Sequence, residues 1–379
     1  GHVQNFSDPL VECKKCHQRF REDHLLEARS REPGYDKEKP TDKGDLKCPE
    51  CGGTLTGAKQ FNLMFKTFVG PTEDSASAAY LRPETAGGIF VNYKNVQQST
   101  RKKLPFGIAQ IGKAFRNEIT VENYIFRVRE FEQMEVEYFI NPKDWEKYFE
   151  EWLAMMKKWC AFLGLKEKDL VFHEIPDNER AFYSKRTIDI EYNFPFGMKE
   201  LYGLAYRTDF DLTRHQKFSG EDLSYLDSET GEKFIPHVIE PSLGLQRSVL
   251  ATLLSAYEEV PGGRTTTTES AKEEEMVLRL PYALAPVKAA ILPLSKKEPL
   301  ATMAKEIANE LRPLWNVQYD DAASIGRRYR RQDEIGTPYC VTVDFESADD
   351  KKVTVRDRDT MAQERVAIAE LKDYLREKI

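Results

Sequence analysis

The sequence predicts an α+β chain in which strands dominate a larger N-terminal part and strands alternate with helices in a smaller C-terminal part. Three observations support this prediction. The chain has 379 residues, 40% of them hydrophobic, which is enough for two to three cores. Short apolar or alternating runs fill residues 61–140. A composition break at 261–276, rich in Gly, Thr and Glu, precedes a region whose hydrophobic period changes repeatedly between strand and helix.

Composition excludes several classes of protein. No apolar run reaches the roughly 18 residues of a membrane span, so we expect no membrane association. The 56 Lys and Arg against 63 Asp and Glu give a net charge of -7. This charge provides no general attraction to nucleic acid, and we expect no DNA partner. Six cysteines are too few for a disulfide framework. Four of the cysteines form two C-x-x-C pairs, which favours a reducing compartment. The start at Gly1 has no charged and apolar leader, so we expect no signal peptide and a cytoplasmic location.

Two C-x-x-C pairs predict a metal site in residues 1–60. Each pair can place two thiolates on one turn, and two such turns form a tetrahedral site for Zn²⁺. The alternatives are a redox pair or unligated cysteines. His17 and His24 are spare ligand candidates that fit ordinary surface histidines better. The four predicted ligands are Cys13, Cys16, Cys48 and Cys51.

Helices and strands in the N-terminal part are predicted from the spacing of apolar residues and from residues that end such elements. The polar tract 29–47 between the cysteine pairs predicts a loop. Residues 145–163 carry apolar side chains at helical spacing and stop at Gly164. More strands are expected as far as residue 239, and then a helix over 244–257.

The C-terminal part alternates between the two periods. Thr360 with Gln363 three residues later matches a capping box, which predicts a last helix beginning there. The other elements expected are strands at 287–292, 317–319, 339–345 and 352–355 and helices at 299–311 and 325–334.

Residues 113–139 predict two strands joined by a loop of about six residues, 119–124. One face of the second strand is ionic and the other is apolar. The ionic face has two interpretations: a solvated face with cross-strand ion pairs, or a phosphate cradle whose neighbouring carboxylates hold a cation. The ionic positions are Arg127, Arg129, Gln133, Glu135 and Glu137, and the apolar positions are Phe126, Val128, Met134, Val136 and Tyr138.

Two further segments carry polar groups next to apolar runs. Glu84 lies in the turn-rich stretch 81–90. Residues 238–247 predict a buried strand that turns at Glu240-Pro241-Ser242 and enters a helix whose first turn presents Arg247. Each signal is weak alone, because a glutamate at a strand end is usually a surface residue.

Together these segments resemble a known family. Phe115-Arg116-Asn117-Glu118, followed downstream by Gly244-Leu245-Gln246-Arg247, resembles motifs 2 and 3 of class II aminoacyl-tRNA synthetases. Two further segments are similar to sequences of homodimeric glycyl-tRNA synthetases. They are Arg-Pro-Glu-Thr-Ala at 82–86 and Phe-Arg-Val-Arg-Glu-Phe-Glu-Gln-Met-Glu at 126–135. Residues 324–338 are similar to the anticodon-binding domain shared with threonyl, prolyl and histidyl enzymes.

The resemblance implies a fold and a reaction. The fold would be a class II antiparallel-sheet catalytic core with a zinc-binding insertion and a C-terminal α/β anticodon-binding domain. Its parts would be a zinc-binding segment at 1–60, the core at 61–260, a linker at 261–276 and the anticodon-binding domain at 277–379. The reaction would be glycine activation by ATP and Mg²⁺, followed by glycyl transfer to the terminal adenosine of tRNA(Gly). The family has more chain before this start, including the dimer-forming motif 1, so a homodimer is expected of the full-length protein.

The resemblance also implies residue roles. Arg116 would bind the α-phosphate and Arg247 the γ-phosphate as the two catalytic residues, and Glu200 would hold Mg²⁺ or the nucleotide. The implied ATP-binding set is Arg116, Asn117, Glu118, Phe126, Arg127, Val128, Arg129, Glu130, Phe131, Glu200, Leu201 and Arg247. The implied glycine-binding set is Arg21, Glu84, Phe131, Glu132, Gln133, Met134, Glu135, Arg207, Glu240 and Ser242.

Because glycine offers only its ammonium and carboxylate, clustered glutamates would recognise it, and their mutual repulsion predicts raised pKa values in the empty enzyme. Gly87 and Gln246 depart from the family, which usually has Gln and an acidic residue there. The implied tRNA contacts surround Tyr329, a residue suited to base stacking, where the alternative is a solvated helix face. They are Arg327, Arg328, Arg330 and Arg331.

Three other functions fit parts of the sequence. A catalytically silent, synthetase-like nucleic-acid-binding protein would be expected to lack Arg116, Glu135 or Arg247, and all three are present. An amino-acid ligase that works without tRNA would lack residues 277–379. A zinc-ribbon RNA binder accounts only for residues 1–60.

Overall fold

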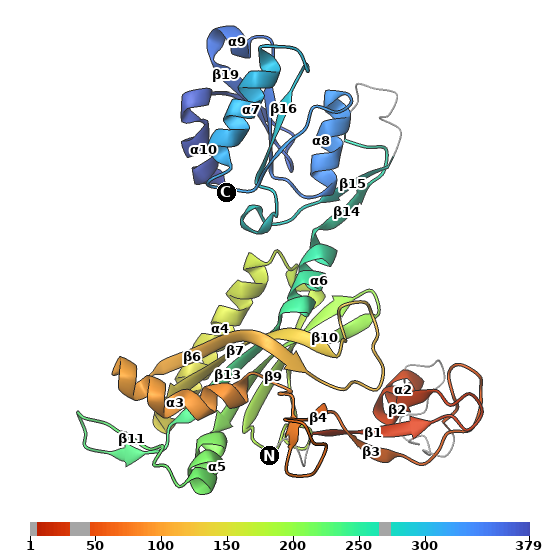
Figure 1. Cartoon of the computed structure of the whole chain (residues 1–379), viewed down its shortest axis with the longest axis vertical. Coiled ribbons are helices and arrows are strands. Elements are labelled where there is room, and N and C mark those ends of the chain that lie inside the picture. The colour runs from red at the N-terminus through yellow and green to blue at the C-terminus, as the bar shows by residue number, and fades with distance from the viewer. Residues whose placement is uncertain (1–5, 31–45, 265–273) are drawn as a thin grey trace. The chain divides into compact units, whose positions relative to one another are not determined.

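The computed structural model describes residues 6–30, 46–264 and 274–379 (Figure 1). It divides into two compact units. The first takes in residues 1–156 and 170–250, and the second takes in residues 157–169 and 251–379. None of the helices in the described ranges is both long and apolar enough to span a bilayer.

The first unit is built on a six-stranded sheet in which all neighbours are antiparallel. Strands that are distant in the sequence are neighbours in this sheet: β13, near the end of the unit, lies between β7 and β10. In sheet order they are β6 (Phe106–Phe115), β7 (Glu130–Ile140), β13 (His237–Gly244), β10 (Gly197–Thr208), β9 (Arg186–Phe194) and β8 (Leu170–Glu174).

Helices cover both faces of this sheet. Helices α3 (Ala86–Thr100) and α5 (Phe210–Ser219) share a buried cluster with Phe139 of β7. Tyr138, the next residue of the strand, points to the opposite face and packs edge-on against two aromatic rings of α4 (Trp145–Phe162). Alternate residues of β7 therefore face different helix layers.

The ionic face of β7 is buried rather than solvated. Gln133, Glu135 and Glu137 are at most 6% exposed, and they lie on the same face as Phe139. The interpretation of this face as solvent-exposed is therefore wrong for these three residues. These three polar side chains are shielded from water, which is unfavourable unless they are paired or used.

The loop between β6 and β7 is longer than expected. It covers residues 116–129, so Phe126 and its neighbours are not part of a strand. The backbone N–H of Arg116 donates to Arg129 O at the base of the loop, and a bridge between Glu122 and Arg127 narrows its tip. The alternating polar and apolar residues at 125–129, which predicted a strand, therefore lie in a loop.

The sequence predicted strands or turns in the two segments that form helices α3 and α5. Gly87 and Gly88 in the first turn of α3 weaken the helical signal, and no side chain caps that end. Ile89, Phe90 and Tyr93 nevertheless share one face, and tertiary burial of that face stabilises the helix. The turn expected at Glu240-Pro241-Ser242 is also wrong, because β13 continues through these residues.

The cysteine pairs lie in a small module of the first unit. Its sheet has β1 (Ser7–Glu12) between β2 (Arg19–Arg21) and β3 (Lys59–Asn62). Helix α2 (Glu22–Ser30) begins directly after β2, so residue 29 of the expected loop is helical. Residues 31–45 of that loop lie outside the described residues. Four short strands form two separate hairpins: β4 (Lys66–Phe68) with β5 (Ala78–Tyr80), and β11 (Tyr225–Leu226) with β12 (Lys233–Phe234).

The second unit has a five-stranded sheet in which the neighbours of β16 are parallel to it and the remaining pairs are antiparallel. The expected strands and helices between residues 287 and 355 are confirmed within a few residues. In sheet order the strands are β17 (Val317–Tyr319), β16 (Ala289–Pro293), β18 (Tyr339–Val343), β19 (Lys352–Asp357) and β20 (Gln363–Ala367). The helices are α7 (Leu300–Leu311), α8 (Ile325–Glu334), α9 (Ser347–Asp350) and α10 (Leu371–Lys378).

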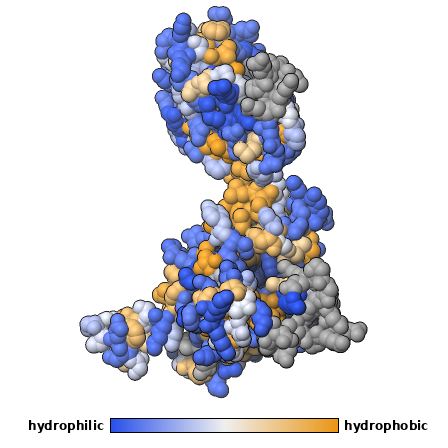
Figure 2. Space-filling model, turned by 90° about the vertical axis from the view of Figure 1, so that its right-hand side faces the viewer, coloured by the Kyte–Doolittle hydropathy of each residue, from blue (hydrophilic) through white to orange (hydrophobic). Residues whose placement is uncertain are grey.

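Helices α7 and α10 pack with one buried cluster of this sheet, whereas α8 packs on Ala290, Leu292 and Cys340. The surface that Figure 2 presents for this unit is mainly hydrophilic, with scattered hydrophobic residues. Helix α6 (Leu245–Ala256), which was expected at 244–257, leads into β14 (Tyr257–Val260), and β14 pairs with β15 (Glu275–Leu278).

The helix predicted to begin at Thr360 is wrong. Thr360 lies in a turn after β19, where its N–H and its hydroxyl both donate to Asp357 Oδ1 at 2.8 Å. Gln363 begins strand β20, which pairs with β19, and the last helix begins only at Leu371. The Thr-x-x-Gln pattern resembles a capping box, but the Asp357 side chain organises a turn that leads back into the sheet.

Candidate active site

Two adjoining clefts open on the six-stranded sheet. The smaller, of about 120 Å³, lies between the 116–129 loop, β10 and the start of α6. The larger, of about 370 Å³, lies over the carboxylates of β7 and β13. Both clefts are lined by Arg116, Gln133, Glu200 and Ser242. Ligands in the two clefts would therefore meet at these four side chains.

Arg116 is held by contacts that leave its guanidinium at this junction. Its Nε donates to Pro83 O at 3.1 Å, which fixes the side chain beside the segment that carries Glu84. The guanidinium carbon lies 5.2 Å from the ring centre of Phe6 and 5.3 Å from that of Phe131. Aromatic faces favour a nearby cation without neutralising it, so the charge remains available to an anion.

Arg247 borders the smaller cleft from the first turn of α6. Its guanidinium carbon lies 4.2 Å from the ring centre of Phe126, and Nη1 donates to Glu200 O at 2.7 Å. Phe126 packs edge-on against Phe194 and a neighbouring ring, which holds it in place. This cleft thus combines an aromatic face, three guanidinium groups and one exposed carboxylate, Glu200, that can ligate a cation.

Glu135 is the centre of a buried hydrogen-bond network. Thr85, at the N-terminus of α3, donates to Glu135 Oε2 from its N–H at 3.0 Å and also from its hydroxyl. Gln133 Nε2 and Ser242 Oγ donate to Glu135 Oε1 at 2.6 and 3.0 Å. A helix N-terminus favours a negative charge, so α3 stabilises this carboxylate although water is excluded. Glu84 lies immediately before this helix.

Arg207 lies beneath the carboxylates of the larger cleft and is fully buried. Nε and Nη2 donate to the two oxygens of Asp211 at 2.8 and 3.0 Å, and Nη1 donates to Glu240. Its guanidinium carbon lies 4.0 Å from the ring centre of Tyr183. Within the described residues, both carboxyl oxygens of the nearby Glu137 are buried without a hydrogen-bond partner.

The expected rise in carboxyl pKa is confirmed in direction. Burial raises the pKa of Glu135, Glu137 and Glu240, and repulsion from neighbouring carboxylates adds to this effect. The pKa of Glu240 rises to about 7, because burial outweighs the opposing attraction to Arg207. The site therefore carries more acidic groups than it can ionise at once without a further cation.

The clefts contain most of the predicted site residues. Arg207 does not line the larger cleft itself but contacts two residues that do, Glu240 and Tyr183. Arg21 instead pairs with Asp8 at 2.6 Å in the cysteine module. The predicted residues that line one or both clefts are Glu84, Arg116, Glu118, Phe126, Arg127, Val128, Phe131, Gln133, Glu135, Glu200, Leu201, Glu240, Ser242 and Arg247. Those that line neither are Arg21, Asn117, Arg129, Glu130, Glu132, Met134 and Arg207.

Other cleft residues were not predicted. Asp189 of β9 lines the larger cleft, and burial, followed by repulsion from Glu200, raises its pKa to about 7. Arg180 and Tyr183 line it from the segment between β8 and β9. The only sequence signal for Asp189 is its place inside an apolar strand. Gln246, a departure from the family, accepts a hydrogen bond from Glu132 N at 2.9 Å through its amide oxygen, as a carboxylate could.

Comparison with known proteins matches both units. Residues 67–257 match the model described as "tRNA synthetase class II core domain (G, H, P, S and T)", and residues 288–378 match "Anticodon binding domain". The chain is 52% identical over its full length to the glycine–tRNA ligase of Thermobifida fusca, covering 82% of that protein. It is 53% identical to those of Streptomyces coelicolor and Geobacillus kaustophilus, over 99% and 100% of the chain and 82% and 83% of those proteins.

The chain belongs to the glycine–tRNA ligase family. The expected fold, a class II core with an antiparallel sheet and an anticodon-binding domain, is confirmed. In this ligase family member, the two clefts lie within the stretch that matches the core model.

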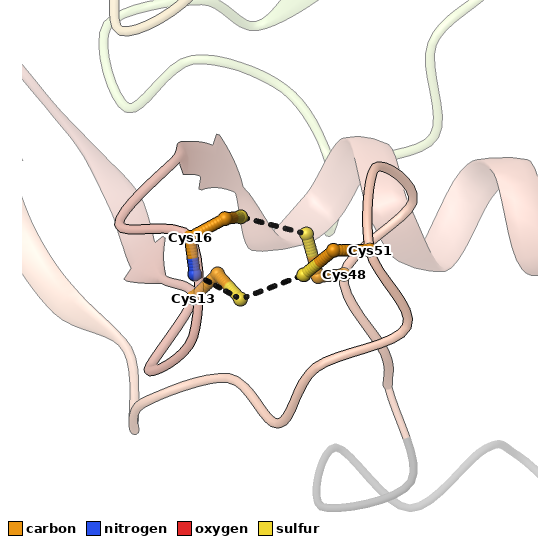
Figure 3. A group of neighbouring side chains, drawn as sticks. All are labelled: Cys13, Cys16, Cys48 and Cys51. Carbon is orange, nitrogen blue, oxygen red and sulfur yellow. Dashed lines mark hydrogen bonds between the residues drawn. The ribbon is translucent and has the colours of Figure 1, made fainter.

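The four predicted metal ligands of this family member come together (Figure 3). Their sulfur atoms all lie within 4.8 Å of one another, with Cys13 Sγ to Cys51 Sγ at 3.5 Å and Cys16 Sγ to Cys48 Sγ at 3.6 Å. A ZnS₄ tetrahedron with Zn–S bonds near 2.3 Å has sulfur edges of about 3.8 Å. The backbone N–H of Cys16 donates to Cys13 Sγ and lowers the pKa of Cys13 to about 6, which favours the thiolate.

The arginines predicted to contact tRNA differ in exposure. Arg328 is 3% exposed, and its Nη1 donates to Pro293 O at 2.6 Å and to Asp320 O at 3.2 Å. Arg331 pairs with Asp320, and Arg330 lies 3.3 Å from Glu334. Arg327 is exposed. The geometry thus makes Arg328 a structural residue of the α/β sheet rather than part of an open basic face.

Tyr329, which was suggested as a base-stacking residue, also makes its contacts within the domain. Its hydroxyl shares a hydrogen bond of 2.6 Å with Thr342, and its ring lies 4.8 Å from the guanidinium carbon of Arg356. The ring packs against the cluster beneath α8. The hydroxyl and the ring of Tyr329 therefore both have partners inside the domain.

Proposed function

We propose that this chain activates glycine with ATP and transfers the glycyl group to the 3′-terminal adenosine of tRNA(Gly). The observation that carries the proposal is the shared border of the two clefts, where Arg116 lies between an aromatic, cationic cleft and an acidic one. The first suits a nucleoside triphosphate and the second suits a small ammonium compound.

The chemistry needs positioning rather than a protein nucleophile. The glycine carboxylate attacks the α-phosphorus of ATP, the bond to the β-phosphate oxygen breaks, and pyrophosphate leaves. Arg116 would neutralise charge at the α-phosphate and Arg247 at the γ-phosphate, with Glu200 holding the Mg²⁺ that accompanies ATP. A ribose hydroxyl of the tRNA terminus then attacks the carbonyl carbon of the adenylate, and AMP leaves.

Recognition of glycine relies on its ammonium group. Glu84, Glu135 and Glu240 border one cleft and would surround that group, while Ser242 would lie near the Cα atom. A hydrogen side chain offers no apolar contact, so rejection of larger amino acids must come from steric exclusion. The excess of carboxyl groups over cations in this cleft supports such a role.

Glycine-dependent exchange of pyrophosphate into ATP tests the proposal. The chain should catalyse exchange with glycine and not with alanine or serine. Aminoacylation of total tRNA, followed by identification of the charged species, tests the second step. Exchange without any charging of tRNA would favour the alternative of a tRNA-independent adenylating ligase. Absence of exchange in a folded, metal-loaded protein would favour a catalytically silent relative that binds nucleic acid.

Glycine affinity should increase as the pH rises from about 5 to 8. Glu240 has a pKa near 7, and only its ionised form attracts the ammonium. Stability should change in the opposite direction, because a carboxyl whose folded pKa is raised stabilises the fold when protonated, and this stability is lost as the pH passes 7. Calorimetric titration with glycine across this range, with unfolding midpoints measured in parallel, tests both trends. A constant glycine affinity would contradict the assignment of Glu240.

Charge reversal at Arg327 should lower aminoacylation several-fold and leave pyrophosphate exchange unchanged. The exposed guanidinium would attract the phosphate backbone of tRNA, and its loss affects only the step that needs tRNA. Arg328 is left unchanged in this test, because a glutamate at its buried position would unfold the domain. Arg376→Glu on α10 makes the same charge change at another exposed site and serves as control. Equal losses in both variants would show a general charge effect.

We also propose a cofactor, an assembly and the limits of the domains. The sulfur geometry fits Zn²⁺, which would stabilise the module formed by β1, β2 and α2. The homodimer and the cytoplasmic location are proposed for the full-length protein. The proposed domains are a zinc-binding segment (1–60), a catalytic core (61–260), a linker (261–276) and an anticodon-binding domain (277–379). Residues 265–273 of the linker lie outside the described residues.

A further inference from the structure

Helix α2 of the cysteine module contacts the loop that forms one wall of the smaller cleft. Arg127 Nη1 lies 2.9 Å from Nε2 and 3.1 Å from Nδ1 of His24. Arg127 lines the cleft, and it also lies 3.3 Å from Glu122 of the same loop. The module thus supports the 116–129 loop at the residue through which that loop borders the cleft.

A second contact joins α2 to the opposite wall. Glu27 Oε1 pairs with Lys199 Nζ at 2.8 Å, three residues after His24 along the helix. Lys199 precedes Glu200, which lines both clefts. One short helix therefore contacts two segments that are distant in sequence and that enclose the same cleft.

These contacts are more protected than ordinary surface pairs. The side chains of Arg127, His24 and Lys199 are 17%, 31% and 28% exposed. A guanidinium has no acceptor atom, so it can donate only to a neutral imidazole. Burial and the nearby Arg127 charge lower the pKa of His24 to about 4, so the ring is neutral near pH 7. The donor and the acceptor therefore match at physiological pH.

The same helix is joined closely to the metal-ligand cluster. Strand β2 begins three residues after Cys16 and runs directly into α2. The Cys13 N–H donates to Gln18 O, and Val11 pairs with Phe20, so the chain between the first cysteine pair and the helix is held to β1. None of the four cysteines lines either cleft.

We propose that α2 is a positioning element of the ATP site, in which His24 and Glu27 hold Arg127 and Lys199 and thereby couple the cysteine module to nucleotide binding. The inference rests on the proposed function, since it assigns ATP to the smaller cleft. His24 and Glu27 act through other residues and do not touch the substrates. Metal binding at the cysteines then affects ATP affinity and leaves glycine affinity unchanged.

The test compares KM for ATP and for glycine in the pyrophosphate exchange reaction, using the full chain with its metal. His24→Ala and Glu27→Gln should each raise KM for ATP about five-fold, the size expected for a coupled contact, and change KM for glycine less than about two-fold. His173→Ala, which removes a half-exposed imidazole on β8, and Glu229→Gln, which breaks the exposed pair with Lys103, are matched controls. Both controls should retain the KM values of the unmodified chain.

A double-mutant cycle separates positioning from general destabilisation. If His24 acts through Arg127, the effects of His24→Ala and Arg127→Ala on ATP affinity should not add, because either change removes the same contact. Hydrogen exchange without substrates should become faster in residues 116–129 and stay unchanged in β10 and β13. Unchanged KM for ATP, additive effects, or equal increases in both KM values would overturn the inference. Absence of exchange activity in the unmodified chain would instead overturn the proposed function.

The coupling to the cysteines has its own readout. Cys48→Ser should lower the bound zinc measured by elemental analysis and speed hydrogen exchange both in residues 22–30 and in residues 116–129. Loss of zinc with unchanged exchange in 116–129 would show that the metal site and the loop are independent. Unchanged exchange in β7 and β13 is the check that the catalytic sheet remains folded.

Discussion

Replacing Arg116 with alanine should lower the rate of glycine-dependent pyrophosphate exchange about 100- to 1000-fold. Arg116 borders both clefts. Under the proposed function, the attacked phosphorus would lie next to its charge. Removal of one preorganised charged donor from such a position typically costs this much in rate. The loss should appear mainly in kcat, because the charge at the α-phosphate develops in the transition state.

The fold should tolerate this change. The hydrogen bond that Arg116 Nε donates to Pro83 O is worth about 1 kcal/mol. Lys113→Ala serves as the control, since Lys113 lies near the end of β6, three residues before Arg116, and pairs with Glu130 at an exposed position. The control should retain its exchange rate within about two-fold. Exchange by Arg116→Ala at the rate of the unmodified chain would exclude Arg116 from the reaction.

Replacing Arg207 with methionine should destabilise the first unit by about 3–5 kcal/mol, the usual cost of removing one partner of a buried ion pair. The variant leaves Glu240 and Asp211 without their common cation, and Glu137 loses a nearby positive charge. Destabilisation should be larger at pH 8 than at pH 6, because the carboxyls with raised pKa values ionise over this range. Denaturant unfolding at both pH values measures the difference.

Arg186 supplies a matched comparison. It pairs with Glu150 at 2.7 Å and with Glu174 at 2.8 Å, but both of these carboxylates are more than half exposed. Arg186→Met should therefore cost about 1 kcal/mol or less. Similar costs for the two arginine variants would mean that burial of the Arg207 cluster does not govern its contribution to stability.

The sequence predicted the C-terminal domain more accurately than the N-terminal sheet. Strands such as 317–319 and helices such as 325–334 are local patterns, and the structure has them at the same residues. Helix α3 was missed because Gly87 and Gly88 weaken the local signal, while the burial that stabilises it comes from strands over 100 residues away as well as from adjacent ones. The helix start predicted at Thr360 is wrong for the opposite reason. The local sequence pattern is strong, but Thr360 donates a hydrogen bond to the Asp357 side chain and lies in a turn.

The candidate site shows the same division. The resemblance to the synthetase motifs singled out Arg116, Arg247 and the carboxylates, and these side chains suit phosphate and ammonium groups wherever they lie. The sequence could not distinguish Arg328 from Arg327, which are adjacent on one helix. Their roles separate only because Pro293 O and Asp320 O lie beside one of them and solvent lies beside the other.

By itself the sequence determined the kinds of chemical group available, the family, and the order of most helices and strands in the second unit. The tertiary structure alone decided which face of β7 is buried, which carboxyls share Arg207, and which wall of the smaller cleft contacts α2. The physical reason is that burial and electrostatic pairing depend on neighbours brought from distant parts of the chain, whereas periodicity and residue chemistry are properties of each segment alone.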